Sequence, residues 1–215
     1  LANVYLHYVL DLWFEKCIKK QLYGEAYLVR FADDFLIMFQ YERDAQRVYE
    51  AIIKRMELFG LELSKEKTRI LPFGRYSASR ETFDFLGFTH FNSKTRKGYY
   101  SVGHKISRKK KKQFKSNLKR WVKENRNTQF DEFMKALNKK LTGSFNYYSL
   151  SGMIREVRSL WIHSLYVTFK WLNRRSQRRS FKLERFYEIW NVRIIHPYIH
   201  VDIWSGDKVI YNKNV

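Results

Sequence analysis

The chain has 215 residues, of which 45% are hydrophobic and 18% aromatic, so it can bury a core and is not a disordered tail. Its single cysteine excludes an internal disulfide framework and a cysteine-based zinc cluster, and no apolar run approaches the roughly 20 residues that span a bilayer. The net charge is +21, and residues 105–185 alone hold 23 basic against 5 acidic side chains. This asymmetry favours a nucleic-acid partner over an anionic membrane surface or a merely soluble basic domain.

The first half of the chain alternates helical and strand patterns. Apolar residues recur at helical spacing over residues 4–17 and again over 42–59, where Gly60 ends the pattern. Short apolar runs at 28–32 and 35–39 predict two buried strands. Further short strands are expected in LELSKEKTRIL and FDFLGFTHF, with a turn and an edge strand in RKGYYSVG.

The second half reads as helical. Helical spacing of apolar residues over 106–122 and 129–141 leaves a face that is mostly lysine and arginine. A loop is expected in TGSFNYYSLSG, then a long helix over 153–173, a basic break and a short helix over 181–190. The sequence therefore predicts an α+β fold with domains at 1–103 and 104–203 and a C-terminal tail at 204–215.

Two adjacent aspartates, Asp33 and Asp34, stand between the two apolar runs of YLVRFADDFLIMF. Their position predicts the two-residue connection of a hairpin, although they lack the glycine that such tight turns favour. Two carboxylates this close repel each other unless a cation compensates, and oxygen ligands suit Mg²⁺ or Mn²⁺. A solvated polar turn accounts for the same residues, so both interpretations stay open at this point.

Four segments resemble, in order and spacing, the reverse transcriptases that group II introns encode. FADD is similar to the Tyr/Phe-x-Asp-Asp box of that family, and LANVYLHYVLD to the helix after its Pro-Gln-Gly box. GLELSKEKTRI resembles the block that ends in Lys-Thr, and FDFLGF the Phe-Leu-Gly-Phe block that supports the primer strand. The basic half resembles the thumb, or maturase (X) domain, with GSFNYY matching a Gly-x-x-Asn-Tyr-Tyr element before a long helix and the Arg-rich RRSQRR.

The resemblance implies a partial reverse-transcriptase palm followed by a basic helical thumb, and it assigns roles to particular residues. Asp33 and Asp34 would be the catalytic ligands of Mg²⁺ or Mn²⁺, and Lys67 would lie near the incoming phosphates. The primer grip would be shaped by Phe85, Leu86, Gly87 and Phe88. Nucleic acid would be bound by Arg108, Lys109, Lys110, Lys111, Lys112, Lys119, Arg174, Arg175, Arg178 and Arg179, with the expected loop tyrosines Tyr147 and Tyr148 stacking on bases.

The same resemblance predicts an incomplete catalytic centre. In the family a third aspartate comes from an earlier palm strand, which would lie before Leu1 together with the fingers, and Asp11 is no substitute because it falls in the helix after the Pro-Gln-Gly box. We expect this chain alone not to polymerise, and a homodimer or a complementing N-terminal polypeptide is possible.

The expected partners are structured intron RNA and an RNA template with a DNA primer, not a membrane, in a bacterial cytoplasm or an organelle. Two alternatives are an RNA-binding splicing cofactor without polymerase activity and a related reverse transcriptase used in defence or CRISPR systems.

Overall fold

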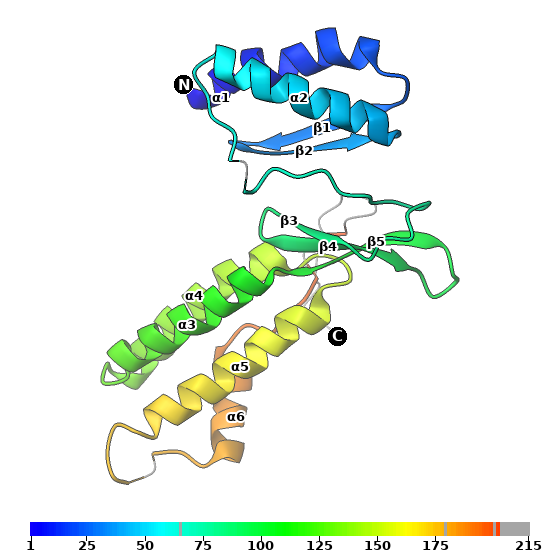
Figure 1. Ribbon diagram of the computed structural model, residues 1–215. Coiled ribbons are helices and arrows are strands. Elements are labelled where there is room, and N and C mark those ends of the chain that lie inside the picture. The colour runs from blue at the N-terminus through cyan, green and yellow to red at the C-terminus, as the bar shows by residue number, and fades with distance from the viewer. Residues whose placement is uncertain (65, 179, 200, 203–215) are drawn as a thin grey trace. The chain divides into compact units, whose positions relative to one another are not determined.

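The computed structural model describes residues 1–64, 66–178, 180–199 and 201–202 (Figure 1). Over these ranges it contains six α-helices and two small sheets, in agreement with the α+β class. Backbone contacts divide the chain into two compact units. The first unit comprises Leu1–Leu86 and Phe91–Val102, and the second comprises Gly87–His90 and the described part of Gly103–Val215.

Two sequence predictions fall outside the described residues. They are the nucleic-acid-binding role of Arg179 and the C-terminal tail at 204–215. Among the helices of the described ranges, none combines the length and the apolar character needed to cross a bilayer.

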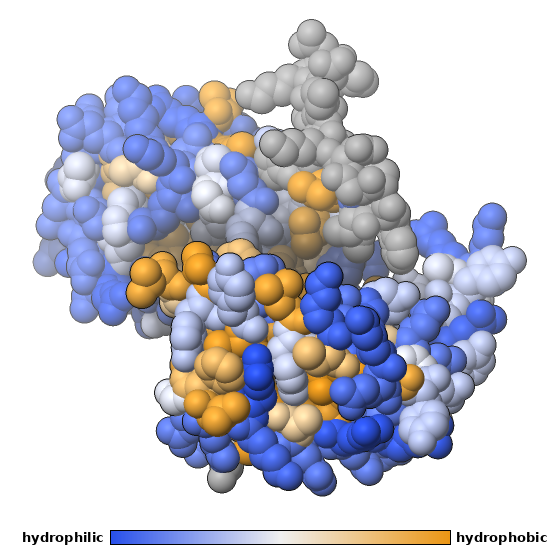
Figure 2. Space-filling model, turned by 90° about the horizontal axis from the view of Figure 1, so that it is seen from above, coloured by the Kyte–Doolittle hydropathy of each residue, from blue (hydrophilic) through white to orange (hydrophobic). Residues whose placement is uncertain are grey.

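The first unit opens with a helical segment, as the apolar spacing predicts. Two of its parts are π-helical, a form wider than the α-helix. The π-helix is rare in proteins, and where it occurs it often lies at a functional site. Its parts are α1 (Ala2–Leu6), η1 (His7–Leu12), η2 (Phe14–Ile18) and the 3₁₀ turn η3 (Lys19–Gln21). Figure 2, which views the molecule from above, shows orange hydrophobic residues among blue hydrophilic ones. Exposed apolar side chains of this N-terminal segment include Leu1, Val4 and Tyr8.

A β-hairpin and a long helix complete the core of the first unit. The hairpin consists of β1 (Ala26–Phe31) and β2 (Asp34–Phe39), and α2 (Glu42–Leu58) follows it and ends before Gly60, which has φ +68°. Figure 1 shows α2 and the N-terminal helical segment on the same face of the hairpin. Residues buried between these layers are Val9, Leu10, Phe14, Ala26, Val48, Ile52 and Met56.

Asp44 fixes the start of α2 against the chain that leads into β1. Its carboxylate is buried, and Oδ2 accepts hydrogen bonds from the backbone N–H groups of Tyr23 and Gly24, both at 3.1 Å. A buried carboxylate that binds two main-chain donors is a structural anchor, because it satisfies amides that would otherwise be orphaned. We therefore assign Asp44 no part in the functional site.

The second sheet has three strands in the order β3-β4-β5, namely β3 (Thr82–Phe85), β4 (Phe88–Lys94) and β5 (Tyr100–Ile106). β5 is an edge strand, as RKGYYSVG predicts, whereas FDFLGFTHF forms a hairpin instead of one strand.

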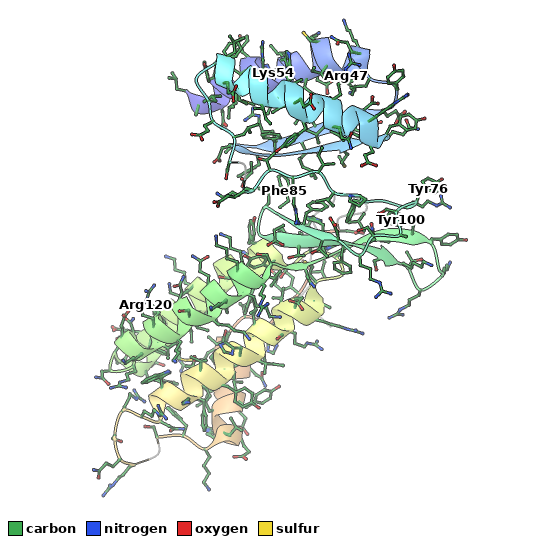
Figure 3. The ribbon with its side chains drawn as sticks, in the orientation of Figure 1. Arg47, Lys54, Tyr76, Phe85, Tyr100 and Arg120 are labelled. Atoms are coloured by element: carbon green, nitrogen blue, oxygen red, sulfur yellow. The ribbon has the colours of Figure 1, made fainter. Side chains whose placement is uncertain are left out.

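The side chain of Asn92 binds the backbone of the preceding loop: Oδ1 accepts from the Gly74 N–H at 3.1 Å and Nδ2 donates to the Ser79 carbonyl at 3.1 Å. Tyr100, labelled in Figure 3, also donates to Asn92 Oδ1 (2.9 Å), and burial raises the pKa of its phenol.

The strand predicted in LELSKEKTRIL is wrong for the described residues of that segment. The Ser64 carbonyl accepts hydrogen bonds from the backbone N–H groups of Lys67 (3.0 Å) and Thr68 (2.9 Å) and from the Thr68 hydroxyl (2.9 Å). Three local donors on one carbonyl close a turn, which competes with an extended strand at this point.

The second unit is a helical bundle, as its apolar spacing predicts. Its helices are α3 (Arg108–Asn125), α4 (Phe130–Tyr148), α5 (Ile154–Leu172) and α6 (Leu183–Arg193). Trp190 of α6 is fully buried, and its ring lies 5.9 Å from that of Trp161 and 6.0 Å from that of Phe186. Other buried members of this core include Leu118, Val122, Phe133, Met134, Leu137, Leu141, Phe145, Val157, Leu160 and Leu165.

The loop predicted in TGSFNYYSLSG is also partly wrong, because α4 continues through it to Tyr148. Gly143 lies inside the helix, where glycine costs only about 1 kcal/mol relative to alanine. Burial of Leu141 and Phe145 on either side of it offsets that cost. Tyr147 and Tyr148 therefore belong to the last turn of a helix and not to a loop.

Candidate nucleic-acid interface

The aspartate pair lies at the tip of the β1–β2 hairpin, but the predicted connection is shifted by one residue. Phe31 pairs with Asp34 in the register, so the two turn residues are Ala32 and Asp33, and Asp34 begins β2. Ala32 has φ +54°, a left-handed conformation that costs a residue with a Cβ about 1 to 2 kcal/mol. Both aspartates are exposed, so their carboxylates are accessible to ligands. The hairpin is confirmed, and its two-residue turn is Ala32-Asp33 instead of Asp33-Asp34.

The strand register places Asp34 on an apolar face of the hairpin that the core does not cover. Cross-strand partners on this face are Tyr27 with Met38, Val29 with Leu36, and Phe31 with Asp34. Phe31 is 65% exposed and Tyr27 53%. The opposite face holds Ala26, Leu28, Phe35, Ile37 and Phe39, which pack on the helices. An exposed apolar sheet face next to two carboxylates is typical of a binding surface.

Arg30 connects the hairpin turn to the N-terminal helices, a link not predicted from the sequence. Its guanidinium donates two hydrogen bonds to Asp11, from Nε to Oδ1 at 2.8 Å and from Nη2 to Oδ2 at 2.7 Å. Nη1 also donates to the carbonyl of Ala32, in the turn, at 2.8 Å. These hydrogen bonds hold the pKa of Asp11 below its usual value and raise that of Arg30. An arginine at an inward strand position was the available signal, since such a charge needs a partner.

The aspartate pair can supply part of a metal site. Oxygen ligands from carboxylates suit Mg²⁺ or Mn²⁺. Within the described ranges, no group of three or more His, Cys, Asp or Glu side chains could hold a metal ion. Asp11 is engaged by Arg30, so it does not add a third ligand. Asp33 and Asp34 therefore suit two of the ligands of a Mg²⁺ or Mn²⁺ site, and the ion needs further ligands from elsewhere.

A second candidate site lies around the β3–β4 turn, where residues from three predicted groups come together in the second unit. The Gly87 carbonyl accepts a hydrogen bond from the Ser107 N–H at 3.0 Å, at the start of α3. A Cβ on Gly87 would lie 3.5 Å from Lys110 Cγ and 3.6 Å from the Tyr148 hydroxyl. Phe88 stacks on Tyr147 at 5.6 Å between ring centroids and meets Tyr148 edge-on at 5.5 Å. We call Gly87, Phe88, Lys110, Tyr147 and Tyr148 the aromatic–lysine site.

The exposure of the aromatic–lysine site differs among its members. Tyr147 is 52% exposed and Lys110 is exposed, whereas burial raises the pKa of the Tyr148 phenol. Tyr148 thus supports the exposed ring of Tyr147, which touches it at 4.9 Å between centroids. The face of Tyr147 opposite Phe88 can stack on a base and the Lys110 ammonium, at the same turn, can bind a phosphate, a combination that suits a nucleotide.

The basic run at 108–112 occupies the first turns of α3. Ser107 caps the helix, and its first turn has no acidic residue. Cations are unfavourable there because a helix N-terminus bears about half a positive charge. Lys111 is neutralised by Glu156 at 3.0 Å, whereas Arg108, Lys109, Lys110 and Lys112 are exposed. Helix stability does not explain this charge, so an anionic ligand is the better explanation.

The other predicted site residues are spread over both units. In the first unit Lys67 is exposed in a turn, and Phe85 (Figure 3) and Leu86 are half-buried at the end of β3 and in the turn after it. In the second unit Lys119 is exposed on α3, next to Arg120, which Figure 3 labels. Arg174 and Arg178 are exposed after α5, and Arg175 donates to the Leu172 carbonyl at 3.1 Å.

Gly87 offers a test of the aromatic–lysine site. Its φ is +82°, and Gly98 has a similar φ of +84° but nothing within 4 Å of a Cβ. We expect Gly87→Val and Gly98→Val each to lower the free energy of unfolding by about 1 to 3 kcal/mol, because a branched residue is strained at positive φ. Only Gly87→Val should also weaken RNA binding, since its methyl groups would displace Lys110 and Tyr148.

The two valine variants are compared by urea unfolding and by RNA titration at the same salt concentration. Equal RNA affinities for both would show that the surroundings of Gly87 take no part in binding.

Comparison with known proteins finds a family match for the first 90 residues of the chain. Residues 1–90 match the family described as reverse transcriptase (RNA-dependent DNA polymerase). The match includes the hairpin with Asp33 and Asp34, Lys67, and the β3–β4 turn. No curated protein matches the chain.

Proposed function

We propose that this chain is the hairpin-bearing palm part and the basic thumb of an RNA-directed DNA polymerase of the group II intron type. The full-length protein would synthesise DNA with Mg²⁺ and would bind intron RNA and assist its splicing. The observation on which this rests most is the exposed Asp33–Asp34 pair at a hairpin tip inside the segment that matches the reverse transcriptase family.

The proposed division of work follows the chemistry of the two candidate sites. Asp33 and Asp34 would hold Mg²⁺ or Mn²⁺, which, when bound, activates the primer 3′-hydroxyl and stabilises the leaving pyrophosphate. The apolar outer face of the hairpin would lie against the primer end, and Lys67 near the incoming phosphates. Gly87 and Phe88 would support the primer strand, with Lys110 on a phosphate and Tyr147 on a base.

A second function is an RNA-binding splicing cofactor without polymerase activity. It requires only the second unit, where the exposed Lys110 and Tyr147 would bind RNA without a metal. The aromatic–lysine site and the basic start of α3 serve RNA binding in either case.

One experiment separates the two functions. The full-length gene product is incubated with an RNA template, a DNA primer, deoxynucleotides and Mg²⁺, and in parallel with an intron RNA at limiting Mg²⁺. Primer extension supports the polymerase, and faster splicing without extension supports the cofactor. Absence of both, together with RNA binding that does not respond to salt, would refute the proposal.

A further inference from the structure

Three cations converge on one tryptophan where α3 and α5 end. Lys123 Nζ lies 5.8 Å from the ring centroid of Trp171, and the guanidinium carbons of Arg126 and Arg174 each lie 5.5 Å from it. Lys123 is in the last turn of α3 and Arg126 caps its end, while Trp171 and Arg174 stand on either side of the end of α5. We call these four residues the Trp171 cluster.

The cluster has no acidic partner in the described part of the chain. None of its three cationic groups forms an ion pair or a side-chain hydrogen bond with a described residue. In sequence, residues 119–128 and 170–182 together hold ten basic side chains and one acidic side chain, Glu124. The positive charge is therefore not balanced locally.

Helix dipoles and cation–π contacts offset only part of the repulsion among these three cations. Two helix C-termini offer about half a negative charge each, roughly one in total against three cations. Cation–π contacts with the indole add about 0.5 to 1 kcal/mol each at an exposed site, but they do not neutralise charge. The remaining repulsion is relieved when an anion binds, and this points to a ligand.

We propose that the Trp171 cluster is a phosphodiester-binding site that holds the backbone of a nucleic acid without reading its bases. This inference rests on the proposed function and adds to it a contact at the opposite end of α3 from the aromatic–lysine site. The indole is already occupied by cations, so it orients them and does not stack on a base. Two guanidinium groups and an ammonium suit successive phosphates, whatever the sequence between them.

The surroundings favour nucleic acid over an anionic membrane. A membrane-binding loop needs apolar side chains that can insert into the interface. The one aromatic residue in the described part of 173–182 is Phe181, and its ring packs against Phe130 at 5.2 Å and Phe186 at 5.4 Å. Because its ring packs against the protein, Phe181 is not available for insertion into a membrane.

The test removes the three charges together. The variant Lys123→Gln/Arg126→Gln/Arg174→Gln is compared with Lys16→Gln/Lys20→Gln/Lys54→Gln, which loses the same charge from exposed positions in the first unit (Lys54 is labelled in Figure 3). The probe is a single-stranded RNA of mixed sequence. We expect the slope of log K against log salt concentration to fall by about 2 for the cluster variant. Its affinity deficit should then shrink roughly 20-fold between 50 and 200 mM salt, whereas the control variant keeps the wild-type slope.

A second measurement on the wild-type chain does not depend on how the variants fold. RNA should protect Lys123 from acetylation and leave Lys54 reactive, and an RNA of a different sequence should protect it equally. Wild-type slope in the cluster variant, with RNA binding otherwise normal, would overturn this inference and leave the proposed function intact. Failure of the wild-type chain to bind RNA would overturn both, and protection of Lys123 by phosphatidylserine vesicles but not by RNA would overturn the phosphodiester assignment.

Discussion

Asp33→Asn and Asp34→Asn are each expected to reduce Mg²⁺-dependent primer extension by the full-length protein about 100-fold or more. Loss of a group that only orients a metal ligand typically costs 10- to 100-fold, and a lost ligand should cost at least as much. Asparagine keeps the shape and one oxygen but removes the charge that holds the cation. The loss is measured as the rate of extension on an RNA template at saturating nucleotide.

These substitutions should leave the fold intact, which makes the result specific. Both side chains are exposed and neither holds the hairpin together, so the free energy of unfolding should change by no more than about 0.5 kcal/mol. Glu50→Gln is the matched control, because Glu50 is an exposed carboxylate on α2 away from the turn. Extension at the wild-type rate in both aspartate variants would remove them from the catalytic site.

The sequence predicted the parts of the fold that depend on local periodicity. The spacing of Val48, Ile52 and Met56 predicted α2, and the helix expected over 153–173 is α5. Apolar runs on either side of the aspartates predicted the hairpin. Such patterns suffice because one face of each element is buried along its length.

Two of the errors arose where a residue takes a conformation against its preference. Ala32 rather than Asp33 has positive φ, although aspartate adopts this region more readily than alanine. Gly143, which suggested a break, lies within α4 because its neighbours are buried. Burial of Leu141 and Phe145 outweighs the cost of about 1 kcal/mol at Gly143, and the hydrogen bond from Arg30 to the Ala32 carbonyl helps to hold the positive φ in the turn.

The functional groupings could not be predicted because they join residues far apart in sequence. Phe88, Lys110 and Tyr147 were each singled out, but their meeting at one turn depends on how α3 and α4 pack. Lys123 and Trp171, which the sequence did not single out, likewise meet only because α3 and α5 pack together. Pairs of this kind leave no periodic signal in a single sequence.

Arg30→Met is expected to lower the free energy of unfolding of the first unit by about 2 to 3 kcal/mol at pH 7. The side chain of Arg30 is only 13% exposed and that of Asp11 25%. Removal of the guanidinium therefore leaves a half-buried carboxylate without its partner. Arg47→Met is the matched control, since Arg47 (Figure 3) is exposed on α2 and donates one long bond of 3.5 Å, to the Gln21 carbonyl. It should change stability by no more than about 0.5 kcal/mol.

The pH dependence of the Arg30 deficit identifies Asp11 as the partner. The pKa of Asp11 is lower in the folded chain than in the unfolded chain, so its contribution to stability is complete above the unfolded value of about 4 and is lost as the pH falls through the folded value. The difference between wild type and Arg30→Met should therefore be constant from pH 5 to 7 and shrink below about pH 4. Urea unfolding followed at pH 7, 5 and 3 measures it, and a difference that does not change with pH would exclude the ion pair as its source.

Loss of Arg30 should also change the conformation of the turn that carries Asp33. Its Nη1 is bonded to the Ala32 carbonyl, directly before Asp33, and this bond helps to hold Ala32 in its strained conformation. Without it the turn should relax, and primer extension should fall even where the protein remains folded. Ala32→Gly adopts positive φ without strain and should restore part of the lost stability in the Arg30→Met background. If extension stays at the wild-type rate in folded Arg30→Met, Arg30 supports the fold and does not position the aspartates.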